Sequence, residues 1–205
     1  GAGHARRKQL FARWRRSPNS LEGHPLYTLG MQVQKGRLTL EGATARVEET
    51  RELRDLADSQ LAELDKRIGE MPASQRGFAF VLASLNYAAA KAKGFRRVQV
   101  DSALRLADMT YDDAGRMRIL HEALNASRKS GYRRGEKVAL STLAQLYTQD
   151  GRYEEAITLY KEQVEGAKAG GYGAIDVESL LALGDIYRQL EQHELALETF
   201  ERTVR

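Results

Sequence analysis

The residues of this chain best suited to metal binding or proton transfer are its four histidines, His4, His24, His121 and His193. None has a second histidine four residues away, and none lies beside a carboxylate cluster with the spacing of metal ligands. The chain contains no cysteine, which excludes thiolate nucleophiles, disulfides and cysteine-ligated metal clusters. The sequence therefore predicts no metal site and no cofactor.

The glycine-rich run GAKAGGYG at residues 166–173 is the stretch closest in composition to a phosphate-binding loop. It follows an expected helix instead of a strand, and it lacks the Gly-Lys-Ser/Thr ending of such loops. No Gly-x-Ser-x-Gly nucleophile motif occurs. Acidic pairs such as Glu154 and Glu155 lie where a helix is expected to begin, and there they complement its dipole. We therefore predict that the chain is not an enzyme.

Positive charge is concentrated in residues 1–20, which contain six basic side chains and no acidic one, whereas the remaining 185 residues contain 26 basic and 28 acidic side chains. Leu10, Phe11 and Trp14 alternate with these charges, so a short helix here would be basic and amphipathic. It could contact an anionic membrane surface, nucleic-acid phosphates or a partner protein, or it could be a solvated tail. The candidate membrane or nucleic-acid contacts are Arg6, Arg7, Lys8, Arg13, Trp14, Arg15 and Arg16.

The composition favours helix along nearly the whole chain. Only three prolines occur in 205 residues, and Ala, Leu, Glu, Arg and Gln are abundant, which predicts an all-α fold. No run approaches the roughly 18 consecutive apolar residues of a membrane-spanning helix. The first residues also lack the apolar centre of a signal peptide. On these grounds we expect a cytoplasmic protein.

The sequence repeats itself at an offset of 40 residues, seen for example between Leu140 and Leu180. Side chains of the same size and character recur in order: Leu140, Leu143, Ala144, Tyr147, Ala156 and Tyr160 correspond to Leu180, Leu183, Gly184, Tyr187, Ala196 and Phe200. The same offset applied upstream, over residues 97–136, gives a weaker match. The chain is therefore built at least partly from repeats.

Each repeat contains two helices. Leu140 and Tyr147 lie on one helical face, and a second face begins with Ala156 after QDGRY interrupts the pattern. Gly94, Gly131 and Gly171 each follow a helical stretch, and we expect them to be left-handed helix caps. Neither helix of a pair can bury its apolar face alone, so successive pairs must stack as in a solenoid.

The pattern L-x-x-L-A-x-x-Y followed by A-x-x-x-Y resembles the tetratricopeptide repeat. The spacing of 40 residues is similar to the long-helix variety found in kinesin light chains, maltose-activator-type regulators and many bacterial sensor proteins. The resemblance is strong over residues 137–205 and moderate over residues 97–136. It implies a right-handed α-solenoid of helix hairpins, with the first helix of each hairpin lining a concave groove.

The expected organisation is a basic tail and linker at residues 1–36, a long helix and a degenerate hairpin at 37–96, and three repeats at 97–136, 137–176 and 177–205. The long helix is predicted from apolar heptad positions between Leu40 and Met71. We interpret it as an amphipathic helix that caps the array, and an intermolecular coiled coil is the alternative. Thr50 and Arg54 interrupt the heptads.

The resemblance also identifies candidate groove residues, which lie between the packing positions of the first helices. The predicted partner-binding residues are Asp101, Arg105, Asp108, Ser141, Thr142, Gln145, Thr148, Gln149, Glu178, Asp185, Arg188 and Gln189. Family members that bind a peptide carboxylate use lysines and asparagines on these faces. Here Ser141, Gln145, Leu181 and Asp185 occupy the corresponding places, which argues against a carboxylate clamp.

The predicted function is a scaffold or adaptor that binds a peptide or helix of another protein. One alternative is a ligand-sensing regulatory domain of a larger bacterial signalling or transcription protein. Another is a non-catalytic assembly subunit of an envelope or secretion complex. The segment LALETFERTVR has an apolar side, so we also expect either further repeats or self-association through the last helix.

Overall fold

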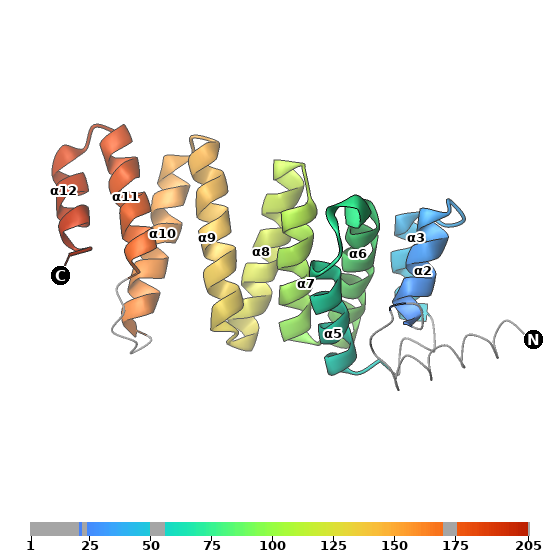
Figure 1. Ribbon diagram of the computed structural model, residues 1–205. Coiled ribbons are helices and arrows are strands. Elements are labelled where there is room, and N and C mark those ends of the chain that lie inside the picture. Colours follow the sequence, from blue (N-terminus) through green and yellow to red (C-terminus); the bar gives the residue numbers. More distant parts are fainter. Residues whose placement is uncertain (1–20, 22–23, 50–55, 170–175, 205) are drawn as a thin grey trace, which may run out of the picture. The chain divides into compact units, whose positions relative to one another are not determined.

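The computed structural model describes residues 21, 24–49, 56–169 and 176–204. Within these residues every regular element is a helix, and each helix packs against at least one of its neighbours in the chain (Figure 1). The predicted all-α fold of helical hairpins is therefore confirmed. The helices form two compact units, with the boundary between Tyr111 and Asp112.

The first unit is organised around α6 (Arg76–Lys93), which packs against every other α-helix described in that unit. These are α2 (Pro25–Gln34), α3 (Leu40–Glu49), α5 (Asp58–Gly69) and α7 (Arg96–Met109), and the short 3₁₀ helix η2 (Ala73–Gln75) precedes α6. Alanines and leucines make up most of the buried residues of α6, and small alanines allow neighbouring helices to approach closely. Because several helices pack on α6, it is the core of this unit.

The second unit is a simple succession of helices in which each packs against the next. It contains α8 (Asp113–Ser130), α9 (Arg133–Gln149), α10 (Tyr153–Ala169), α11 (Val177–Gln189) and α12 (His193–Glu201). The Asp112 carboxylate caps α8 by accepting a hydrogen bond from the Gly115 N–H at 2.7 Å. This local packing order is what stacked hairpins require.

Two of the predicted glycine caps are confirmed. Gly94 ends α6 with φ 72° and Gly131 ends α8 with φ 67°, both in the left-handed region. The N–H of the next residue closes each cap, since Phe95 donates to the Ala90 carbonyl and Tyr132 donates to the Ser127 carbonyl, both at 2.9 Å. Gly171 lies outside the described residues.

The prediction of a single long helix over residues 40–71 is wrong. Residues 56 and 57 are not helical, and Ala57 has extended backbone angles, φ −82° and ψ 158°. The Gln60 side chain accepts a hydrogen bond from the Ala57 N–H at 2.8 Å, which starts α5 as a new helix. The apolar residues that suggested heptads are instead divided between α3 and α5, each of which packs on α6.

The linker expected within residues 1–36 contains the helix α2. Leu26 is fully buried, and a Cβ added at Gly30 would lie 2.8 Å from the Leu82 side chain of α6. This part of the predicted linker is therefore packed into the first unit.

Among the helices of the described ranges, none has both the length and the hydrophobicity that a bilayer span needs.

Candidate partner-binding surface

Helix α9 separates buried from accessible side chains as its sequence predicts. Leu140, Leu143, Ala144 and Tyr147 are buried. Of the other positions on this helix, Gln145 and Gln149 are exposed, Thr142 and Thr148 are half-buried, and Val138 is 41% exposed. The accessible positions supply amides, hydroxyls and one aliphatic group, which suit hydrogen bonding and shallow apolar contact.

Helix α11 repeats this division 40 residues later. Leu180, Leu183 and Tyr187 are buried, whereas Glu178, Asp185, Arg188 and Gln189 are exposed and Leu181 has 45% of its side chain exposed. Arg188 and Asp185 form an ion pair at 2.9 Å on the helix surface. Exposed pairs of this kind contribute little to stability, so both groups remain available to a partner.

A buried glutamine joins the three helices α9, α10 and α11. Gln163 of α10 donates from Nε2 to the Ser141 hydroxyl at 2.8 Å and to the Lys137 carbonyl at 3.1 Å, both on α9. The Ser179 hydroxyl of α11 donates to Gln163 Oε1 at 3.0 Å. Gln163 and Ser179 are 5% and 3% exposed. We call Ser141, Gln163 and Ser179 the polar clamp.

A model of the tetratricopeptide repeat family matches residues 137–205, which begin within α9 and include α10 to α12. Residues 137–205 are thus similar to tetratricopeptide repeats, and we call them the tetratricopeptide segment. Curated protein sequences gave no match to this chain. Tetratricopeptide repeats are in general protein-interaction modules, and their stacked hairpins present extended binding surfaces.

In the tetratricopeptide segment, the polar clamp changes the role of one predicted groove residue. Ser141 was predicted to contact a partner, but its hydroxyl accepts from Gln163 and donates to the Lys137 carbonyl at 3.0 Å. These two hydrogen bonds already occupy the Ser141 hydroxyl. Thr142 and Thr148 are likewise half-buried and donate to the Val138 and Ala144 carbonyls. The predicted groove residues that are exposed in this segment are Gln145, Gln149, Glu178, Asp185, Arg188 and Gln189.

The remaining predicted groove residues lie on α7, in the first unit. Asp108 is exposed and Asp101 is half-buried. The Arg105 guanidinium makes two hydrogen bonds to the Asp65 carboxylate of α5, at 3.1 and 2.8 Å. These hydrogen bonds and the charge of Asp65 raise the Arg105 pKa, against the opposing effect of burial. Arg105 therefore joins α5 to α7 instead of extending towards an acidic partner.

The roles of Asp65 and Gln163 were not predicted, because neither their residue type nor their spacing distinguished them from solvent-exposed residues of a helix. A signal was present for Gln163. It lies eight residues before Gly171, and Ser179 lies eight residues after that glycine. Asn86 and Ser102 have the same relation to Gly94, and Asn86 donates to the Ser102 hydroxyl at 2.9 Å. Polar side chains at equal distances in sequence from a glycine are thus in contact between helices at both places.

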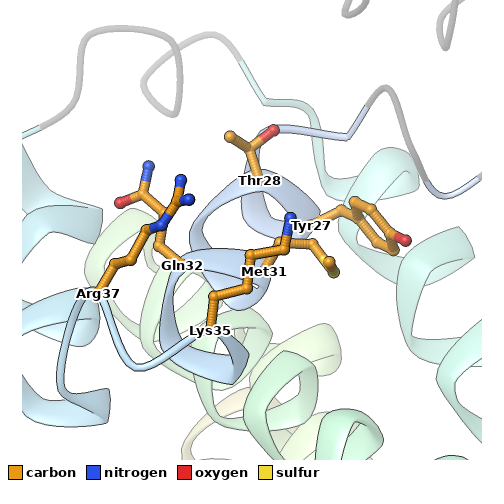
Figure 2. Close-up of a pocket in the computed structure, with 6 residues that line it drawn as sticks. All are labelled: Tyr27, Thr28, Met31, Gln32, Lys35 and Arg37. Atoms are coloured by element: carbon orange, nitrogen blue, oxygen red, sulfur yellow. The ribbon is translucent and has the colours of Figure 1, made fainter.

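Two hollows accompany these helices, one in each unit. Figure 2 shows the hollow of the first unit, about 270 Å³ in volume, on the outer face of α2 and the turn that follows it. Its lining residues are Tyr27, Thr28, Met31, Gln32, Lys35 and Arg37. The other hollow, of about 190 Å³, lies in the tetratricopeptide segment between α10, α11 and α12. We call it the α10–α12 pocket.

Among the described residues, no group of three or more histidine, aspartate or glutamate side chains is arranged to hold a metal ion. His121 instead contacts Tyr147 through Nε2, at 2.8 Å from the tyrosine hydroxyl. Partial burial, together with the charges of Arg152 and Arg128, lowers the His121 pKa. The predicted tail residues Arg6, Arg7, Lys8, Arg13, Trp14, Arg15 and Arg16 lie outside the described residues.

Proposed function

We propose that this chain is a protein–protein interaction scaffold that binds a peptide or helix of a partner on the accessible faces of α9 and α11. The observation that carries the proposal is the alternation, on both helices, of buried packing residues with accessible polar ones. The general role of tetratricopeptide repeats supports it. We call the accessible residues of α9 and α11 the groove face.

The chemistry of the groove face indicates what kind of partner it suits. Val138 and Leu181 offer exposed aliphatic side chains, and Gln145, Gln149 and Gln189 offer amides that can both donate and accept. The charges of Asp185 and Arg188 cancel within their ion pair. A partner segment with a few apolar side chains and accessible backbone groups matches this surface better than a strongly charged one.

Site-specific photocrosslinking in the source cell tests the proposal. A photoreactive amino acid would replace Gln145 on α9 or Leu181 on α11, and Glu154, exposed in the first turn of α10, would be the control position. We expect one and the same protein to be crosslinked from Gln145 and from Leu181, and not from Glu154. A partner crosslinked from Glu154 alone would contradict the groove proposal.

Thermal unfolding in the presence of small metabolites separates this function from the ligand-sensing alternative. A scaffold should show no shift in melting temperature with metabolites, whereas a sensor is stabilised by whatever binds its folded state. A clear metabolite-dependent shift together with no crosslinked protein would favour the sensor.

A further inference from the structure

Tyr147 and Tyr187 occupy equivalent positions in successive repeats, 40 residues apart. The side chains that cover their rings differ. The Arg152 guanidinium lies 4.4 Å from the centre of the Tyr147 ring. Glu155 holds that guanidinium with hydrogen bonds of 2.8 and 2.6 Å. The first of these surfaces is therefore filled by side chains of its own hairpins.

At Tyr187 these covering residues are replaced. Gln192 stands where the preceding repeat has Arg152, and Leu195 stands where it has Glu155. The α10–α12 pocket lies here, with Val164, Leu183 and Tyr187 among its lining residues. Leu195 also lines it and has 44% of its side chain exposed. The loss of an arginine–glutamate pair thus leaves a hollow whose apolar lining residues can contact an apolar side chain from elsewhere.

Helix α12, which borders the α10–α12 pocket, is acidic. It contains Glu194, Glu198 and Glu201 and no lysine or arginine. Of the acidic ones, Glu194 and Glu198 are exposed on α12, and Glu198 lines the pocket. The charges of the pocket lining itself balance, with Lys161 and Arg202 against Glu165 and Glu198, and Lys161 lies over the Tyr187 ring at 5.8 Å. The excess negative charge therefore comes from α12 beside the pocket, and it favours a basic ligand.

A ligand with the matching chemistry is present in the same chain. Residues 5–16, ARRKQLFARWRR, carry six positive charges and no negative one, together with Leu10, Phe11 and Trp14. Basic side chains would meet the carboxylates of α12, and an aromatic side chain would enter the apolar hollow.

We propose that the α10–α12 pocket binds residues 5–16 of a second copy of this chain. Such a contact joins different surfaces of the two copies, so it builds head-to-tail assemblies that either close into rings or continue as filaments. It goes beyond the proposed scaffold function, because it uses α10 and α12 instead of the groove face. It also assigns a role to the basic segment that needs neither a membrane nor a nucleic acid.

Sedimentation velocity of the full chain over a range of protein and salt concentrations tests this inference. We expect association that increases with protein concentration and weakens as salt screens the charges. Leu195→Glu should weaken association by about tenfold or more, because it places a carboxylate in the partly buried hollow where an apolar side chain would bind. A tenfold change corresponds to about 1.4 kcal/mol of binding free energy. Leu197→Glu is the matched control, since Leu197 lies on the same helix, is 63% exposed and does not line the pocket.

Charge reversal identifies the occupant. Glu194→Lys with Glu198→Lys reverses the charge of α12 beside the pocket, and Arg13→Glu with Arg16→Glu reverses part of the charge of the segment. Each pair of changes should weaken association, and a chain that carries all four should associate again. A chain that stays monomeric at every concentration overturns the inference, and so does equal weakening by Leu195→Glu and Leu197→Glu. Crosslinking from Gln145 should be unchanged by Leu195→Glu, so this inference and the groove proposal can fail independently.

Discussion

At the scale of single residues, the contact between Gly184 of α11 and Phe200 of α12 determines how closely the last two helices pack. A Cβ added at Gly184 would overlap the Phe200 ring. The preceding repeat has Ala144 and Tyr160 at these positions, and both are buried. An alanine methyl group therefore fits at this position only where the opposing aromatic ring lies in a different place. The size of the residue that the first helix tolerates depends on where the ring of the second helix lies.

Gly184→Ala should destabilise the fold by about 1–3 kcal/mol, because the added methyl group forces α11 and the Phe200 ring apart. The matched control is Gly166→Ala in α10, where a Cβ would meet nothing within 4 Å. That change should instead stabilise by up to about 1 kcal/mol, since alanine favours helix. Urea denaturation followed by circular dichroism measures both. Equal effects of the two substitutions would contradict the assigned contact.

At the scale of helices, the polar clamp is a recurring device. Asn86 lies eight residues before Gly94 and Gln163 lies eight residues before Gly171, and each contacts a serine eight residues after that glycine. Each also donates to a backbone carbonyl of the preceding helix, Asn86 to Leu61 at 3.1 Å and Gln163 to Lys137 at 3.1 Å. At Gly131 both positions are alanine, Ala123 and Ala139, and both are buried. The two residues of such a pair are therefore either both polar or both apolar.

This pairing makes the effect of clamp substitutions non-additive. Gln163→Ala should cost about 1–3 kcal/mol, because Ser179 then buries a hydroxyl whose acceptor is gone. Adding Ser179→Ala reproduces the alanine pair found at Gly131, so the double variant should be more stable than the sum of the two single effects by at least about 0.5 kcal/mol. A double-mutant cycle in urea measures the coupling. Simple additivity would show that the two side chains act separately.

The helices themselves could be predicted from the sequence, because the packing stripes of α9 and α11 and the caps at Gly94 and Gly131 depend on local spacing. The break between α3 and α5 could not be placed, since Ala57 carries no stop signal and the interruption of the heptads by Thr50 and Arg54 does not by itself end a helix. The roles of Ser141 and Arg105 depend on Gln163 and Asp65, which lie 22 and 40 residues away in the chain. Contacts at such separations follow from tertiary packing and not from local pattern.

At the scale of the whole molecule, charge is distributed unevenly along the chain. The first 20 residues carry six positive charges and no acid, and residues 176–204 carry an excess of five negative charges, seven acidic against two basic. The segment between them, residues 21–175, is close to neutral, with 21 acidic and 23 basic side chains. The net charge of +4 therefore hides two opposed ends. Such a distribution favours association between copies at low salt.

The two units should also differ in their response to acid, because His24 is fully buried in the first unit. Its Nδ1 accepts a hydrogen bond from the Leu26 N–H at 3.2 Å at the start of α2. Burial lowers the His24 pKa from 6.5 to about 3. His121, in the second unit, is less buried than His24, and partial burial lowers its pKa in the same direction.

The sign of the effect follows from proton binding. Above pH 6.5 the histidine is neutral in both the folded and the unfolded chain, so stability does not depend on it. Between pH 6.5 and about 3 only the unfolded chain binds the proton, so the free energy of unfolding should fall by about 1.4 kcal/mol per pH unit. His24→Asn keeps a side-chain cap for α2 but cannot titrate, so its stability between pH 7 and pH 5 should decline less steeply. Hydrogen exchange at these two pH values should show acid-induced opening in α2 and α6 of the original chain and not in the variant. Equal pH dependence of the two proteins would show that acid acts elsewhere in the molecule.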